Sequence, residues 1–497
     1  MDRERFDRIA TALGSAASRR AGVKTAIAML AGFGATSAGL DAGASGRRQR
    51  ASLAGGAALP LGADVDEQRP CGPRAKDNAC KTHQECCTGY CRASKTAGKT
   101  GRCRCLKAGK RCKKGQTCCG GASCKHGRCK VKHACKATVC ASGCAFTSVN
   151  AAYAAAADGA SIYIGPGVYP TGIEITKSIT LGACPGVTGV TLVPDRVQTD
   201  LTGNYVIITE SSTDTTTKRT VTLTNLALAP TTPGAPDEYL LSCYDAGTVS
   251  FTLDGCTATN AKSTFWATGG DHVIAGCTFT GGNTQVYIEP NINTDPVSLT
   301  VTGSSFSGAT NYAVNLGAEG HASGRLRVSE CTFTQNTTSL GYQGDIANRA
   351  NHSMIVTNST FTGNAGDSWT TRIHETIAQF SGCTFIDNQE GGIAGWASDI
   401  TVTDTLIKNG ASQESGGGIY LDSGGMNMNV VVAGTTQITG NSAAQAGGGI
   451  YVTAANGQIV TVTGTNTSNV FGNAVSDCWL DDAVNSINRQ VSCATWT

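Results

Sequence analysis

One short phrase recurs through the second half of the chain, and each copy joins a β-branched run to a polar turn. The copies are AGCTFTGG from Ala275, SECTFTQN from Ser329, NSTFTGN from Asn358, SGCTFIDN from Ser381, and the looser TDTLIKN from Thr403 and TTQITGN from Thr435. A phrase that returns at a similar interval is typical of repeat proteins, in which each copy buries its apolar side on its neighbours. The repeat therefore limits the fold to stacked units of one kind.

The apolar centre of the phrase returns every 21 to 32 residues. We assign this position to Phe279, Phe306, Phe333, Phe361, Phe385, Leu406, Ile438 and Val470. Before the phrase stands an alternating run, such as Leu299-Thr-Val-Thr, whose period of two predicts a half-buried strand. An antiparallel sandwich is the alternative, but hairpin signals such as Asn-Gly are scarce, so we predict an all-β solenoid of parallel coils.

Two further positions of the repeat are predicted to form internal columns. The Asn that ends the phrase would lie at a turn, where Asn tolerates a left-handed backbone, and stacked copies would form a hydrogen-bonded ladder. Its members are Asn336, Asn364, Asn388, Asn409, Asn441 and Asn473. Cys256, Cys277, Cys331 and Cys383 share another position, and only the first two are near enough to bridge. We expect small buried residues here rather than nucleophiles or metal ligands.

The start of the repetitive region carries a family resemblance. The segment FTSVNAAYAAAADGASIYIGPGVYPTGIEITKSITLGA, residues 146–183, resembles the opening of right-handed parallel β-helix proteins of the pectin-lyase-like group, with the match at PGVY from Pro166 and ITLG from Ile179. This resemblance implies a capping helix followed by a right-handed parallel β-helix over residues 137–497. Gly-Gly-Ile triplets beginning at Gly391, Gly417 and Gly448 are similar to repeats of polymorphic outer-membrane proteins, which are surface adhesins. The fold hosts lyases, hydrolases, esterases and non-catalytic binders, so it does not fix the activity.

The charge of the chain is divided between a basic and an acidic part. Residues 1–150 contain 28 Lys and Arg against 9 Asp and Glu, whereas the remainder contains 11 against 27. Such asymmetry indicates a basic module attached to an acidic body.

Residues 1–44 look like a twin-arginine secretion signal. Arg19-Arg20 precede an apolar stretch over residues 25–40 and a small-residue site near Ala42, although Gly22-Val23 replaces the usual Phe-Leu. An Ala- and Gly-rich tail that carries no targeting signal is the alternative. The apolar stretch is short for a membrane span. We therefore expect a secreted or cell-surface protein with no integral membrane segment in the mature chain.

After a linker over residues 45–70, residues 71–136 form a cysteine-rich module. Twelve of the 23 cysteines fall into two sets of the same order: Cys71, Cys80, Cys86, Cys87, Cys91 and Cys103, then Cys105, Cys112, Cys118, Cys119, Cys124 and Cys129. The order resembles tandem knottin modules, in which disulfides replace a core that so short a segment cannot supply. The resemblance implies pairing of the first cysteine with the fourth, the second with the fifth and the third with the sixth. Zinc is the alternative, but paired C-x-x-C knuckles are lacking.

Cysteines outside the module are assigned to the ends of the β-helix. Cys478 and Cys493 are predicted to close a C-terminal cap over the last coil. Cys140, Cys144 and Cys184 are candidates for stapling the N-terminal cap, and their pairing, like that of Cys135 and Cys243, is left open.

The cysteine-rich module is strongly basic. It contains 18 Lys and Arg but only Asp77 and Glu85 as acidic residues. Such a module can anchor a protein to an anionic polymer, such as an acidic cell-surface polysaccharide or a phospholipid. A solvated, disulfide-stapled spacer is the alternative. Specific nucleic-acid binding is disfavoured because Tyr90 is the one aromatic residue that could stack on a base.

A candidate groove is predicted where His and Arg residues gather in irregular segments between copies of the repeat. Loops at equivalent points of neighbouring coils lie on one side of a solenoid, so their residues would form a stripe that binds an extended saccharide. Ordinary solvated loops are the alternative. The candidates are His272, His321, Arg325, Asp345, Arg349, His352, Asp367, Arg372, His374 and Glu375, with Asp271 and Glu319 beside them.

Signals for catalysis are weak. A glycosidase needs two or three carboxylates across a groove, and a lyase needs a calcium site plus a Lys or Arg base. The chain lacks the full N-T-D, G-H-G and R-I-K set of polygalacturonases, of which N-T-D alone occurs, from Asn293, and it lacks a clear pectate-lyase Arg motif. Its one Asp-Asp pair is Asp481-Asp482. We therefore predict a non-catalytic binder of polysaccharide or of an anionic cell-surface polymer, without cofactor or metal. The alternative is a polysaccharide lyase or glycoside hydrolase acting on acidic polysaccharide, with calcium required if it is a lyase.

Overall fold

The structure is a computed structural model that describes most of the predicted β-helix. The described residues are 137–196, 204–209, 217–232, 238–244, 248–289, 296–365, 369–454, 458–464 and 470–480, with short segments at 79–80, 91–92, 101–103, 111, 123–125, 128–130 and 489–490. The proposed signal and linker, residues 1–70, lie outside the described residues, as do Cys493 and the Asp481-Asp482 pair.

Three strands make up each coil, and equivalent strands of successive coils form three parallel sheets. Sheet 1 contains β6 (Ala160–Ile164), β9 (Ile179–Ala183), β12 (Arg219–Thr224), β15 (Val249–Asp254), β18 (Gly270–Ala275), β21 (Val297–Thr302), β24 (Gly324–Ser329), β27 (His352–Thr357), β30 (Ile377–Ser381), β33 (Asp399–Thr403), β37 (Met428–Ala433), β41 (Val460–Gly464) and β44 (Arg489–Gln490). Sheet 2 contains β7 (Gly167–Thr171), β10 (Val190–Arg196), β13 (Ala227–Leu228), β16 (Thr257–Thr259), β19 (Thr278–Thr280), β22 (Ser305–Ser307), β25 (Thr332–Thr334), β28 (Thr360–Thr362), β31 (Thr384–Ile386), β34 (Leu406–Lys408), β38 (Gln437–Thr439) and β42 (Val470–Phe471). Sheet 3 contains β8 (Ile173–Glu174), β11 (Asn204–Thr209), β14 (Glu238–Cys243), β17 (Ser263–Ala267), β20 (Thr284–Ile288), β23 (Tyr312–Gly317), β26 (Thr338–Gln343), β29 (Thr371–His374), β32 (Ile393–Trp396), β36 (Ile419–Asp422), β40 (Ile450–Thr453) and β43 (Cys478–Leu480).

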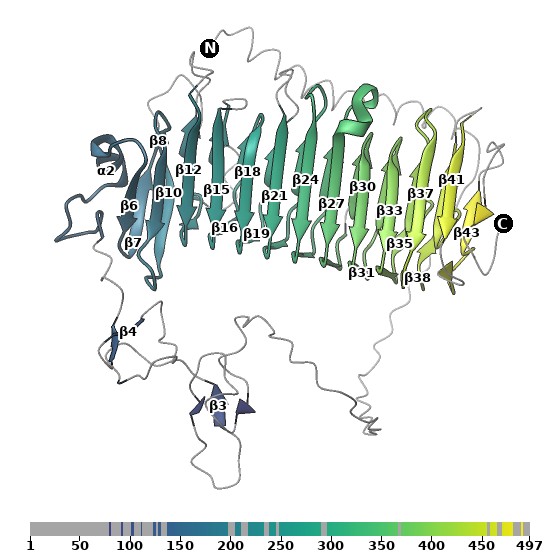
Figure 1. Ribbon diagram of the computed structural model, residues 1–497, viewed down its shortest axis with the longest axis horizontal. Coiled ribbons are helices and arrows are strands. Elements are labelled where there is room, and N and C mark those ends of the chain that lie inside the picture. The colour runs from purple at the N-terminus through teal and green to yellow at the C-terminus, as the bar shows by residue number, and fades with distance from the viewer. Residues whose placement is uncertain are drawn as a thin grey trace, which may run out of the picture. The chain divides into compact units, whose positions relative to one another are not determined.

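The predicted parallel β-helix is therefore confirmed over the described residues. Equivalent strands lie side by side in sequence order along the solenoid (Figure 1). The strand-to-strand pairing within each sheet is parallel, and the antiparallel pair β10 with β11 joins sheets 2 and 3 near the N-terminal end. A small parallel pair, β35 (Ala411–Ser412) with β39 (Ser442–Ala443), adds to two of the later coils.

The alternating runs form sheet 1 because one set of side chains points into the solenoid. In β21, Val297, Leu299 and Val301 are almost fully buried, whereas the residues between them are half-buried. This alternation matches the period of two in the sequence. The interior is consequently a continuous apolar core.

The Phe of the repeated phrase forms a stack inside sheet 2. Phe279, Phe306, Phe333, Phe361 and Phe385 pair in register and lie 4.4 to 5.0 Å apart between ring centroids, with nearly parallel planes. Such rings contribute both buried apolar area and ring-to-ring attraction.

The next position in this column corrects the sequence assignment. Ile407, not Leu406, pairs with Phe385. In the copy TDTLIKN the inward residue is Ile407, and the position equivalent to Asn388 is Gly410. Equating Asn409 with Asn388 shifts the predicted register by one residue. A shift of one residue in a strand exchanges its two faces.

The Asn ladder is present, with two corrections that follow from the same register. Asn336, Asn364, Asn388 and Asn441 are fully or almost fully buried. Asn364, for example, donates from Nδ2 to Phe333 O (3.2 Å) and to Asn388 Oδ1 (2.9 Å). The ladder position that aligns with Asn388 is taken by Gly410, while Asn409 is exposed.

The left-handed backbone lies one residue before the ladder. Gln335 (φ 56°), Asp387 (φ 55°) and Asn409 (φ 56°) adopt it, together with Gly363 and Gly440. The ladder Asn side chains are turned inward to bind backbone groups of neighbouring coils. They were therefore wrongly assigned to the left-handed position.

The column of Cys256, Cys277, Cys331 and Cys383 consists of buried thiols. Ser304, Ser359 and Thr405 occupy the alternating copies, and each accepts a hydrogen bond from the backbone N–H of the Cys one coil earlier, at 3.0 to 3.2 Å. Cys256 and Cys277 are adjacent but form no disulfide; instead Cys256 N donates to Cys277 Sγ (3.4 Å). These residues fill a structural column, as predicted.

The N-terminal end is capped by α2 (Val149–Ala155), as the resemblance implied. Val149, Ala152 and Tyr153 are buried against the first coil. Lys177 donates from Nζ to Ala156 O (2.6 Å), at the C-terminal end of the helix, where a cation is favourable. The cap thereby covers the first coil at the edge where no preceding coil lies.

Some of the remaining cysteines are paired. Cys140 and Cys144 form a disulfide, and both Cys184 and Cys478 are disulfide-bonded. The predicted partner of Cys478, Cys493, lies outside the described residues.

The cysteine-rich module is described only in short strands. β1 (Ala79–Cys80), β2 (Cys91–Arg92) and β3 (Gly101–Cys103) form one small sheet. Within it the backbone of Cys91 lies opposite that of Cys103 in antiparallel register. β4 (Ser123–Lys125) and β5 (Arg128–Lys130) form an antiparallel pair. The pairing of its twelve cysteines is outside the described residues.

Candidate functional site

Three of the four candidate histidines are buried. His272, His321 and His352 have exposed fractions of 1%, 2% and 0%, whereas His374 is partly exposed. His272 lies within β18 and His352 begins β27, so the strands reach further into the irregular segments than the sequence suggested. The structure therefore does not bring the four rings together on one surface.

His272 is a fully bonded neutral residue of the core. Its Nδ1 accepts from Phe251 N (3.2 Å), and its Nε2 donates to Gly269 O (2.6 Å). Protonation would place a second N–H opposite the N–H of Phe251. Burial lowers the pKa of His272 from 6.5 to about 4.

Because of His272, the free energy of unfolding is expected to fall as the pH is lowered from 6.5 to about 4. The unfolded ring takes up a proton near pH 6.5, whereas the folded ring resists it, so in this interval the unfolded state binds more protons. The full contribution is about 3 kcal/mol. Urea unfolding of the wild type and of His272→Gln, which cannot titrate but can still accept from Phe251, measures this slope. Parallel curves of stability against pH for the two proteins would contradict the assignment.

The other predicted residues are distributed over different parts of the solenoid. Arg325 is exposed on the outer face of sheet 1, and Asp367 lies outside the described residues. Asp345 caps the short helix η3 (Ile346–Asn351) by accepting from Ala347 N (2.9 Å). The pKa of Glu375 is raised by burial and further by the negative charges of Glu319 and Asp345.

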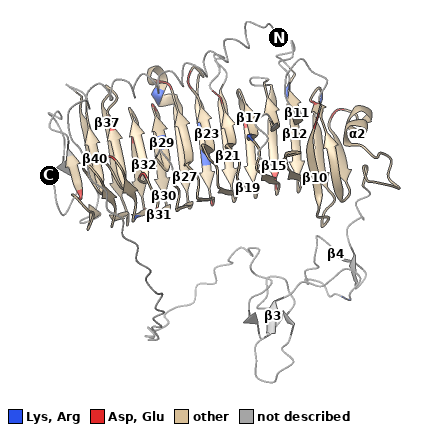
Figure 2. Cartoon of the chain, turned by 180° about the vertical axis from the view of Figure 1, so that it is seen from behind, with Lys and Arg blue, Asp and Glu red and all other residues tan. Residues whose placement is uncertain are grey.

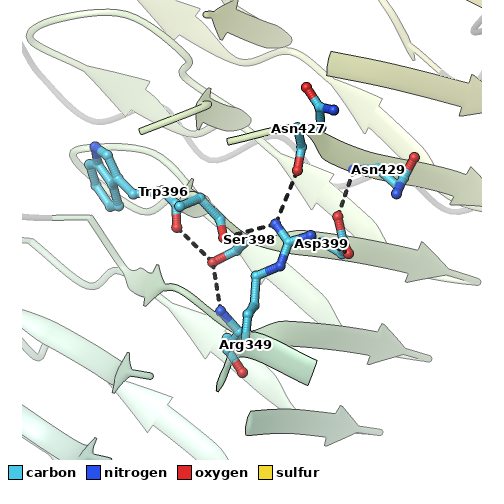
Figure 3. A network of polar contacts seen from close by, with 8 residues as sticks. Arg349, Trp396, Ser398, Asp399, Asn427 and Asn429 are labelled. Carbon is cyan, nitrogen blue, oxygen red and sulfur yellow. Dashed lines mark hydrogen bonds and ion pairs between the residues drawn. The ribbon is translucent and has the colours of Figure 1, made fainter. Parts of the chain in front are cut away.

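Arg349 is a structural residue. From η3 it donates to Ala397 O (3.2 Å) and Asn427 O (3.1 Å), and it forms an ion pair with Asp399 (3.1 Å). Figure 3 shows the guanidinium among these groups, with Asp399 also accepting from Asn429 N (2.7 Å). One side chain thus binds groups that belong to different coils. Arg349 therefore holds these coils together, and its guanidinium is occupied within the fold.

The partly exposed aromatic residues gather on the outer face of sheet 3. Trp396, Tyr420 and Tyr451 stand on β32, β36 and β40, and Trp369 precedes β29. Tyr420 lies 5.1 Å from Trp369, 5.5 Å from Trp396 and 5.4 Å from Tyr451, measured between ring centroids. We call these four residues the aromatic row.

Further aromatic residues lie on sheet 3 on both sides of the aromatic row, and those on the N-terminal side are separated from it by several coils. Trp479 pairs with Tyr451 in register at the C-terminal end. Towards the N-terminal end, Trp266 pairs with Tyr287, which pairs with Asn315. Of the five tryptophans, Trp266, Trp369, Trp396 and Trp479 therefore belong to this face or its edge. Few segments of the solenoid carry the colour of a charged residue in this view (Figure 2).

Glycines next to the row permit its packing. Gly391 has φ 83°, and a Cβ there would overlap the ring of Trp369. Only glycine combines this backbone conformation with room for the ring. Its Gly-Gly-Ile triplet thus supports the face as well as the coil.

Arg372 and His374 complete the polar part of the face. Arg372 donates from Nε to His374 Nε2 (2.9 Å), and its guanidinium carbon lies 5.5 Å from the Trp396 ring centroid. The His374 ring stacks on Trp396 at 4.6 Å. Burial, and then the charge of Arg372, lowers the pKa of His374 to about 4, so the ring is neutral at pH 7.

Carboxylates occur nearby without forming a metal site. Gln343 donates from Nε2 to Glu319 Oε2 (2.7 Å), next to the strand that carries His374. Burial raises the pKa of Glu289, directly after β20. Within the described ranges, no group of three or more His, Cys, Asp or Glu is arranged to hold a metal ion.

Arg372 and His374 were candidates from the sequence, whereas the aromatic row was not predicted. A signal was present, because an aromatic residue directly follows two of the three Gly-Gly-Ile triplets, at Tyr420 and Tyr451. Alternation within the strand turns these residues outward when the Ile is buried.

A family model of known proteins agrees with the fold. Residues 295–463 match the family model of the right handed beta helix region. The crystal structure of tailspike protein 3 of bacteriophage CBA120 is similar at 12% identity and a TM-score of 0.33, covering 69% of this chain and 56% of the tailspike chain. This chain thus aligns with less than two thirds of the tailspike chain. No curated protein matches it. None of the described helices is long and apolar enough to cross a membrane.

Proposed function

We propose that this β-helix protein binds an extended saccharide along the outer face of sheet 3 and does not cleave it. The observation that carries the proposal is the aromatic row, in which Trp369, Trp396, Tyr420 and Tyr451 are in contact yet partly exposed. A soluble protein rarely leaves such a set of rings in water without a binding partner.

The chemistry of the face suits a sugar chain. A pyranose ring presents C–H groups on one side, which pack on an aromatic face, and hydroxyls at its rim, which need hydrogen-bond partners. Arg372 on β29, Asp422 on β36 and Thr453 on β40 are partly exposed beside the row and supply donors and acceptors. Because coils repeat about every 4.8 Å, the face offers similar groups at intervals along an elongated ligand.

Replacing Trp396 by Ala is expected to weaken retention on a polysaccharide by about tenfold, because one stacking surface is lost. Tyr420→Ala should act in the same direction, since Tyr420 contacts both Trp396 and Tyr451. Affinity electrophoresis through gels containing single acidic or neutral polysaccharides measures the change. Tyr163→Ala, which removes a ring that is 38% exposed on sheet 1, is the matched control.

The same proteins separate binding from catalysis. Incubation with the polysaccharide panel, with and without calcium, would release new reducing ends or unsaturated products if the chain were a hydrolase or lyase. Retention without products supports the proposal. Equal retention of wild type, Trp396→Ala and Tyr163→Ala would remove the aromatic row as the binding surface.

We further propose that the chain is exported by the twin-arginine route and acts outside the cell. The Arg19-Arg20 signal and the knottin-like order of the cysteines over residues 71–136 support this. The 18 Lys and Arg of that module would then hold the protein on an anionic surface polymer while sheet 3 binds saccharide. Cell fractionation with Arg19-Arg20→Lys-Lys as the comparison tests the export route.

A further inference from the structure

Arg372 is a partly exposed cation on the proposed binding face. Its one described hydrogen bond goes to His374, and within the described ranges no carboxylate forms an ion pair with it. By contrast, Arg349 has an ion pair and two carbonyl acceptors. The guanidinium of Arg349 is therefore used within the fold, whereas Nη1 and Nη2 of Arg372 make no described hydrogen bond.

The contacts of Arg372 hold its guanidinium without neutralising it. A guanidinium can only donate, so His374 Nε2 must be the acceptor and the His374 ring carries its proton on Nδ1. The Trp396 ring supports the guanidinium from one side. The pair thus keeps a full positive charge, fixed in place, with Nη1 and Nη2 outside any described hydrogen bond.

We propose that Arg372 binds a negatively charged substituent of the saccharide, a carboxylate or a sulfate ester, while the aromatic row binds the sugar rings. The inference rests on the proposed saccharide binding and adds the class of sugar to it. A planar guanidinium can donate two parallel hydrogen bonds to such a group, which a neutral hydroxyl cannot accept in the same way.

Pairs of polymers that differ only in charge test the proposal. Polygalacturonate is compared with its methyl ester, and dextran sulfate with dextran, by affinity electrophoresis of the full chain. Arg372→Gln is expected to bind the charged member about 10- to 100-fold more weakly and to bind the uncharged member within about threefold of wild type. Loss on one pair alone identifies the carboxylate or the sulfate ester.

Arg327→Gln is the matched control. Arg327 is exposed on the outer face of sheet 1, so the substitution removes the same charge away from the aromatic row. The basic N-terminal module is identical in both variants, and its contribution to binding cancels between them. Arg372→Lys keeps the charge but not the planar fork, and should restore part of the affinity.

Each result has a distinct meaning. If wild type is retained but Arg372→Gln and Arg327→Gln behave alike on the charged polymers, the proposed role of Arg372 is contradicted. The proposal that the protein binds saccharide is not affected by that result. A similar loss for Arg372→Gln on charged and uncharged members shows that Arg372 only supports Trp396. If wild type is retained by none of the polymers, the proposed function itself fails.

Discussion

Replacing Phe333 by Ala is expected to lower the free energy of unfolding by about 4 kcal/mol. Phe333 is fully buried and stacks on Phe306 at 5.0 Å and on Phe361 at 4.8 Å, so its removal leaves a cavity and exposes two ring faces to it. Sheet 2 cannot close the cavity, because backbone hydrogen bonds fix the spacing of its strands. Urea unfolding followed by circular dichroism measures the loss.

Two comparison variants make this prediction specific. Phe279→Ala should cost less, because Phe279 stacks on Phe306 but pairs on its other side with Ala258. Val273→Ala, at a side chain 39% exposed on sheet 1, should cost less than about 0.5 kcal/mol. A loss at Phe333 no larger than that at Val273 would show that the stack does not stabilise the solenoid.

Replacing Asn364 by Ala is expected to destabilise the protein by about 3 kcal/mol. The fully buried Asn364 side chain accepts from Asn336 N (3.0 Å) through Oδ1 and donates from Nδ2 to Phe333 O (3.2 Å) and to Asn388 Oδ1 (2.9 Å). Alanine leaves the N–H of Asn336 and the carbonyl of Phe333 buried without these partners, and buried unpaired polar groups are costly. The same unfolding measurement detects the change.

Asn409 provides the control for the ladder. It ends a copy of the same phrase, but it is exposed and donates to Asp387 Oδ1 (3.0 Å) at the surface. Asn409→Gly, which removes the side chain but still permits the left-handed backbone (φ 56°), should therefore change stability by less than about 0.5 kcal/mol. Equal losses at Asn364 and Asn409 would contradict the register that places Gly410, not Asn409, in the ladder.

The fold was predicted well because the same pattern of buried and polar residues recurs many times along the chain. Leu299 and Val301 alternate with polar residues in the way that a half-buried strand requires, and a Phe equivalent to Phe306 recurs in five successive coils. Where a copy departed from the pattern, as at Leu406 and Ile407, one residue of misalignment exchanged the inner and outer faces.

The candidate site was predicted only in part because exposure cannot be read from residue type. His272 and His374 look alike in sequence, yet one is bonded inside the core and the other stacks on Trp396 at the surface. The difference depends on strand register, which decides the face of each side chain. The outward orientation of Tyr420 and Trp396 depends on the same register and was not predicted.

The contacts of Arg349 have a consequence for how the solenoid comes apart. In a stack of repeats, each coil touches its neighbours, so coils can detach one after another from a free end. Arg349, just before β27, joins its coil to Ala397 directly after β32, to Asp399 at the start of β33 and to Asn427 before β37. Coils that detach one by one from the C-terminal end would reach the contacts of Arg349 before the centre of the solenoid. The coils that these contacts join would then have to unfold together.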